Sequence, residues 1–279
     1  MKPSDKLGRW VGRIVRQAVV ILATLMSLFP VYFMVVSAFK TRGEYIANKW
    51  GLPTTPILDN FAIAFAGEKF LIRFANSTIL TVGSVGISLI IACLAAYAFA
   101  RMDFPGKRAI FNVLLSLMVV PPVVMLVPLF VSMVRLKLVN TYPGTILIYV
   151  GLLLPFSVYL MTNFFRTIPR EIMEAAHIDG ASSFGVFWRI MMPLSAPAVI
   201  TLIVVNALWV WNELLIALVF MQKDELKTLM VGITALRSKH YVDIPVTMAG
   251  LFIATLPIVV LYMFGQKYFI RGLVSGAVK

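Results

Sequence analysis

Six long runs of apolar residues limit the folds open to this sequence more than any other feature. Each is close to the roughly 20 residues that a helix needs to cross the hydrocarbon core of a bilayer. With 60% hydrophobic and 13% charged residues among 279, the chain is too apolar for an ordinary soluble domain. We therefore predict an all-α membrane protein with about six transmembrane helices. The runs are residues 18–38, 77–100, 109–133, 145–165, 196–221 and 246–269.

Prolines interrupt two of these runs. Pro121, Pro122 and Pro128 lie within the third, and Pro155 lies in the middle of the fourth. A proline inside a helix leaves a backbone carbonyl without its usual partner, so neighbouring groups or water must satisfy it. We expect the third helix to kink beside a cavity.

The basic N-terminal tail, residues 1–16, carries five Lys or Arg residues and precedes the first run. A signal peptide is the competing interpretation, since Val36-Ser37-Ala38 resembles a cleavage site, but this run is longer than a typical signal core. We favour an uncleaved first span, with residues 17–279 as one transmembrane domain. The positive-inside rule then places the tail in the cytoplasm, and an even number of spans places both termini there.

The formal net charge of +13 has two explanations. Basic residues beside membrane spans meet anionic lipid headgroups, whereas nucleic-acid binding needs a base-reading motif that the sequence lacks. We predict membrane lipid, and no nucleic acid, as the partner of these charges. Cys93 is the single cysteine, so no internal disulfide is possible. No Walker A pattern occurs, so we expect no nucleotide cofactor on this chain.

A polar island separates the fourth and fifth runs. Pro169 suits the first turn of a helix, and residues 169–178 predict a short helix that Gly180 ends in a left-handed conformation. Ser182 or Ser183 is expected to cap a second helix that stops before Pro193. Two adjacent alanines, Ala175 and Ala176, leave part of the first helix almost without side chain, which lets another backbone come close.

This island resembles the cytoplasmic "EAA" loop of permease subunits in binding-protein-dependent ABC importers, and most closely the maltose-type carbohydrate importers. The family pattern is Glu-Ala-Ala, three residues, Gly, nine residues, Ile, one residue, Leu-Pro. The matching residues are Glu174, Ala175, Ala176, Gly180, Ile190 and Pro193, with Met192 where Leu is usual. Two further patches support the resemblance, Trp211-Asn212-Glu213 and the ending from Arg271 to Lys279.

The resemblance implies a coupling loop over residues 166–193 whose first helix seats in a cleft of a cytoplasmic ATPase. Glu174, Ala175, Ala176, Asp179 and Gly180 would form that contact. The tail would also reach the ATPase dimer through its last five residues, Ser275, Gly276, Ala277, Val278 and Lys279.

The resemblance also implies partners and a location. They are a second homologous permease, a dimer of ABC ATPases that holds ATP and Mg, and an extracytoplasmic solute-binding protein. The location would be a prokaryotic cytoplasmic membrane. The implied function is ATP-driven import of a carbohydrate by alternating access, with hydrolysis in the ATPase and not in this chain.

Glu213 is the one acidic residue that we place inside a span. A carboxylate there is costly unless it faces the bundle interior or a water-filled path. Asn206 and Asn212 extend a polar stripe along the same predicted helix. The stripe either lines the translocation path or makes structural hydrogen bonds to a neighbouring helix or a partner subunit.

Two alternatives remain open from sequence, and a third has no support. The importer could carry a non-sugar solute, such as glycerol phosphate or a polyol. A self-sufficient secondary transporter could use Glu213 as its ion site. A membrane-embedded enzyme finds no support, because neither His177 nor His240 has catalytic or metal-binding partners at suitable spacing.

Overall fold

The computed structural model describes residues 3–66, 69–235 and 243–277. Helices make up the regular structure and no strand occurs in these ranges, which confirms the predicted all-α class. The chain divides into two compact units. The first contains residues 1–68 and 235–255, and the second contains residues 69–234 and 256–279.

The first unit contains α1 (Pro3–Ala38), α2 (Arg42–Ala47), α3 (Asp59–Ala66) and the start of α14 (Ile244–Ala277). The basic tail forms the first turns of α1 from residue 3 onward. Beyond the tail, α1 is apolar, and its residues 12–38 meet the length and hydropathy of a membrane span. Few of its side chains are buried by other described residues, so this helix has an apolar surface available to lipid or another subunit.

A buried lysine organises the connection after α1. The Lys40 side chain is fully buried, and its Nζ donates a 2.6 Å hydrogen bond to the carbonyl of Asn48. The Asn60 amide donates to the carbonyls of Ala38 and Lys40 at 2.8 and 2.7 Å. These bonds fix α3 against the end of α1.

The second unit is built on α4 (Phe70–Arg101) and α7 (Tyr142–Thr167), which pack along one another and against α11 (Ala196–Asn212). The helices approach closely where side chains are small. A Cβ at Gly83 would lie 2.8 Å from the end of the Ile146 side chain, so a larger residue in α4 would require that side chain of α7 to move. The unit also contains α5 (Lys107–Ser116), η1 (Leu117–Val119), α6 (Pro122–Arg135), α12 (Leu215–Phe220), η3 (Asp224–Leu226), α13 (Leu229–Ala235, whose last residue falls in the first unit) and the remainder of α14.

Four helices are individually long and apolar enough to cross a membrane, and two bent pairs bring the number to six if each pair is one span. The third predicted span is one of these pairs. Residues 107–119 and 122–135 meet at 104°, and Pro121 has an extended conformation at the bend. The expected kink is therefore confirmed, and its cause is the proline pair, which cannot continue the helical hydrogen bonds.

Two boundary predictions are wrong. The run 196–221 is not one helix, because Glu213 is extended (ψ 129°) and separates α11 from α12. The second helix of the polar island also does not stop before Pro193. It continues as α9 (Ser183–Val186), a π-helical turn η2 (Phe187–Met191) and α10 (Met192–Leu194). The wider turn just before Pro193 accommodates a residue that has no N–H to donate.

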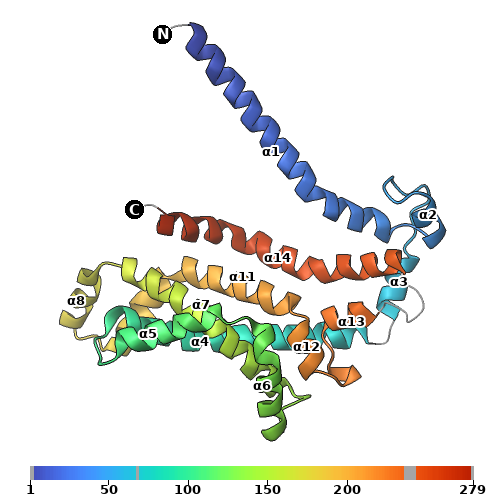
Figure 1. Cartoon of the computed structure of the whole chain (residues 1–279). Coiled ribbons are helices and arrows are strands. Elements are labelled where there is room, and N and C mark those ends of the chain that lie inside the picture. The colour runs from blue at the N-terminus through green and yellow to red at the C-terminus, as the bar shows by residue number, and fades with distance from the viewer. Residues whose placement is uncertain (1–2, 67–68, 236–242, 278–279) are drawn as a thin grey trace. The chain divides into compact units, whose positions relative to one another are not determined.

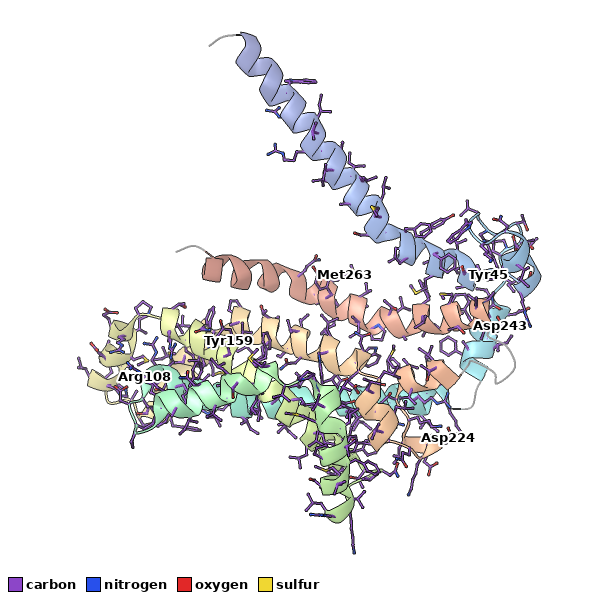
Figure 2. The ribbon with its side chains drawn as sticks, viewed as in Figure 1. Tyr45, Arg108, Tyr159, Asp224, Asp243 and Met263 are labelled. Atoms are coloured by element: carbon purple, nitrogen blue, oxygen red, sulfur yellow. The ribbon has the colours of Figure 1, made fainter. Side chains whose placement is uncertain are left out.

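An ion-pair cluster joins η3 to the start of α4. The Asp224 carboxylate bonds to Lys69 and lies 3.1 Å from Lys227 Nζ and 3.7 Å from an Arg73 nitrogen. These partners lower the pKa of Asp224 to about 2, first through the Lys69 hydrogen bond and then through Lys227. Figure 2 shows Asp224 at one end of the second unit and Arg108 at the other.

The Asp224 cluster predicts an acid-dependent stability. A lowered pKa stabilises the fold fully above the ordinary value of 3.8, and this contribution is lost as the pH falls towards 2. We expect Asp224→Asn to lower the thermal midpoint at neutral pH but not near pH 2, measured on detergent-solubilised protein. Asp103→Asn is the control, since that carboxylate is fully exposed and pairs only with Lys107. An equal loss at both pH values would contradict the prediction.

Candidate docking surface and central cavity

A short helix, α8 (Arg170–Ile178), lies at one end of the second unit (Figure 1). Its end confirms the predicted glycine turn: Gly180 has φ 83°, the Gly180 amide donates to His177 O at 3.0 Å, and the Ala181 amide donates to Ala176 O at 2.9 Å. This pair of bonds is a Schellman motif, which satisfies the last carbonyls of the helix. Ser182 caps α9 by accepting from the Gly185 amide at 3.2 Å.

One face of α8 packs against the bundle. Ala176 is buried in a cluster that includes Phe165 of α7 and Phe187 of η2, and the partly buried Met173 packs beside it. The small alanine side chain lets the α8 backbone approach these aromatic rings. This face fixes which side of α8 remains available to a partner.

The opposite face of α8 is exposed. Glu174 and Ala175 of the helix, and Asp179 and Gly180 just beyond its end, are exposed, whereas Ala176 points into the core. Ile178 is 86% exposed and Ile172 is 39% exposed. Three-residue steps place residues 172, 175 and 178 along one side of the helix. Our sequence reasoning missed both isoleucines, although this spacing was visible in the sequence.

Arg101, at the end of α4, holds the chain just before α8. Its guanidinium donates to the carbonyls of Phe165 and Ile168, at the end of α7. One turn earlier in α4, the Tyr97 hydroxyl donates to Ser183 O at 3.2 Å, at the start of α9. The ends of the α8 segment are thus tied to α4. No sequence signal distinguished Arg101 from the other basic residues that flank the spans.

The left-handed turn at Gly180 gives a direct prediction. An L-residue at this φ costs about 1–2 kcal/mol, although no atom would contact its Cβ. We expect Gly180→Ala to speed hydrogen exchange of the amides at positions 180 and 181 about 5- to 30-fold. Gly86→Ala is the matched control, because that glycine also has open space but ordinary helical geometry. If these two amides exchange at the same rate in both variants, alanine at position 180 causes no strain.

A cavity of about 520 Å³ lies between α6, α7 and α11. Its walls are mostly aliphatic, with methionines from η1 and α6 and one proline each from α6 and α7, and Asn206 and Trp209 of α11 provide polar and aromatic groups. The Asn206 amide donates to the Ser157 hydroxyl at 2.9 Å. The prediction of a cavity beside the kinked helix is confirmed, since Val120 and Pro122 line it.

The three polar residues of the predicted stripe do not form one surface. Asn206 is buried at the cavity wall, whereas Asn212 is exposed and donates to Leu208 O within its own helix. Glu213 accepts hydrogen bonds from the Tyr149 hydroxyl (2.9 Å) and from the amides of Ile216 and Ala217. Its carboxylate thus caps the first turn of α12.

The remaining candidate residues belong to the C-terminal tail. Ser275, Gly276 and Ala277 form the end of α14, and Val278 and Lys279 lie outside the described residues. Within the described residues, no group of three or more His, Cys, Asp or Glu side chains is placed to hold a metal ion.

Comparisons with known proteins agree with this architecture. The family described as "Binding-protein-dependent transport system inner membrane component" matches residues 86–275. A putative ABC transporter permease protein from Caldicellulosiruptor sp. is 38% identical and covers 92% of this chain and 93% of its own. The melibiose/raffinose/stachyose import permease protein MelC of Bacillus subtilis is 34% identical, with coverages of 94% and 96%.

A solved structure gives the same result for the fold. One chain in the crystal structure of a bacterial ABC transporter involved in the import of the acidic polysaccharide alginate superposes with a TM-score of 0.84. The two sequences are 23% identical, and the match covers 96% of this chain and 99% of that chain.

Proposed function

The chain belongs to the family of inner-membrane components of binding-protein-dependent transport systems, and from that premise we propose that it is a permease subunit through which an ABC importer moves a carbohydrate. Membership makes it a multi-pass membrane protein, in agreement with its apolar helices. The single observation that carries the proposal beyond the family is the exposed face of α8, which a partner can cover.

The partner that we assign to α8 is a cytoplasmic ATPase. The face combines a small residue, Ala175, with exposed Ile172 and Ile178 and the acids Glu174 and Asp179. Apolar anchors surrounded by charge are typical of protein–protein interfaces. ATP and Mg would bind in that subunit, which hydrolyses ATP while this chain moves the solute. The last five residues would add a second contact with it.

This arrangement assigns the sides of the membrane. With α8 in the cytoplasm, the basic tail and the C-terminus lie there too, and the Asp224 cluster faces the extracytoplasmic solute-binding protein. The apolar surface of α1 would contact lipid and a second, homologous permease.

Carbohydrate is the proposed solute because the related protein MelC bears the name of a melibiose, raffinose and stachyose import permease. Trp209 and Asn206 at the cavity offer a flat ring and an amide, a combination that suits a sugar. An ion-coupled mechanism at Glu213 has less support. That carboxylate already accepts hydrogen bonds from one hydroxyl and two amides, so its acceptors are engaged in holding α12.

The test is to purify the gently solubilised complex from its native membrane and measure its mass and ATPase activity. We expect this chain with a second permease and two ATPase copies, stimulated by one binding protein loaded with a sugar. If only a binding protein loaded with a non-sugar solute stimulates the ATPase activity, the chain is still an importer subunit, but its solute is not a carbohydrate. Recovery of this chain without an ATPase would contradict the proposal.

A further inference from the structure

A polar hollow of about 360 Å³ lies where α5 begins, beside the last turns of α4 and α7. It is distinct from the central cavity and from the exposed face of α8. Its lining includes Phe99, Asp103, Lys107, Arg108, Phe111 and Arg166. Three of these side chains are basic and one is acidic, so the hollow carries a net positive charge.

Two of the three cations lack a carboxylate partner. Asp103 forms its ion pair with Lys107 at 3.2 Å. Arg108 and Arg166 take part in none of the ion pairs found among the described residues. Two uncompensated guanidinium groups at one hollow favour an anion, and guanidinium geometry suits a phosphate group.

The floor of the hollow is aromatic. The rings of Phe99 and Phe111 lie 5.2 Å apart between centroids, and Phe99 also contacts Phe104 at 5.8 Å. The Arg166 guanidinium carbon stands 5.5 Å above the Phe111 ring, a cation–π distance. The site therefore offers charge at its rim and an apolar surface beneath, which matches an amphipathic ligand better than a free ion.

The hollow also lies at the level where apolar spans end. The spans of α4 and α7 run to Arg101 and Thr167, and α5 begins at Lys107. Beyond this first turn, α5 exposes Ile110 and Val113, at 52% and 62%. A ligand with its phosphate at the rim could lay an acyl chain along that apolar face. Basic pockets between spans are typical sites for anionic lipid headgroups.

We propose that this hollow binds the headgroup of an anionic phospholipid, with its phosphate between Arg108 and Arg166. The bound lipid would join the start of α5 to Arg166 in the last turn of α7, four residues before α8 begins. The hollow shares no lining residue with the cavity between α6, α7 and α11, so the proposal can fail while the importer function stands.

The test is native mass spectrometry of the full chain in its purified complex, with phosphatidylglycerol or phosphatidylcholine added in detergent. We expect preferential retention of phosphatidylglycerol. Each lost basic residue should weaken retention about 5-fold, so R108Q with R166Q should weaken it about 25-fold. The double variant R108K with R166K keeps both charges and should recover most of the binding. That recovery would show that the double glutamine variant loses lipid because it loses charge.

The control variant is Arg135→Gln, an exposed arginine in the last turn of α6. It should retain phosphatidylglycerol as the unmodified chain does. Equal retention of both lipids, or equal loss in the control, would overturn the proposal. Displacement of the lipid by inorganic phosphate at millimolar concentration would also overturn it, because the hollow would then be a site for free phosphate.

Discussion

Replacing Ala175 by tryptophan should separate this chain from its ATPase without unfolding it. Ala175 is exposed on α8, so the new side chain has room in the isolated chain but occupies the space that a docked partner needs. We expect ATPase binding at least about 30-fold weaker, the size of an interface hot spot, and a comparable loss of solute uptake. Co-purification and uptake in reconstituted vesicles measure the two effects.

A matched substitution tests whether position matters. Ala62→Trp adds the same side chain at an exposed position of α3, and we expect it to leave ATPase binding unchanged. Ile178→Ser is a complementary variant, because it removes an 86% exposed apolar group without adding bulk. If Ala175→Trp and Ile178→Ser both co-purify normally with the ATPase, the exposed face of α8 is not the docking surface.

The second large effect is expected at Arg101. Arg101→Gln removes the guanidinium that bonds to the carbonyls of Phe165 and Ile168, at the end of α7. The Phe165 carbonyl would keep its bond from the Ile168 amide, but the Ile168 carbonyl would lose this partner, which should cost about 1–3 kcal/mol. We expect a lower unfolding midpoint. In the assembled importer we also expect more ATP to be hydrolysed for each solute molecule moved, because α8 would no longer move together with α4.

Two variants separate this role from general stability. Arg101→Lys keeps the charge but loses the planar fork, so it should restore the midpoint only in part. Arg135→Gln removes an exposed arginine at the end of α6 and should change neither quantity. If Arg101→Gln lowers the midpoint while the ratio of hydrolysis to transport stays constant, Arg101 stabilises the bundle but does not position α8.

Local chemistry made part of this structure predictable. Gly180 predicted a left-handed turn, because glycine adopts that conformation at little cost. The Pro121-Pro122 pair predicted a bend, because proline cannot continue the helical hydrogen bonds. The break at Glu213 was not predictable, because no proline or glycine marks it within an apolar run. It depends on hydrogen bonds to Tyr149 and to the amides of α12, which only the folded chain brings together.

The candidate docking site was also predictable only in part. The family pattern selected Glu174, Ala175 and Gly180, which are exposed in the structure, the first two in α8 and the third in the turn after it. The pattern did not reveal Arg101, because its partners lie more than 60 positions along the chain. It also gave no reason to separate Ala175 from Ala176, and only packing against α7 and η2 shows that the second is buried.

The short length of α8 has a consequence for inhibitor design. Nine residues are too few for a stable helix alone in water, since helices under about 12 residues are marginal there. The helicity of α8 therefore depends on the Arg101 hydrogen bonds, the buried Ala176 and the glycine turn. A synthetic peptide copied from this segment would lack all the partners that α4 and α7 supply. A covalently braced mimic would be needed to present the same face to the proposed ATPase partner.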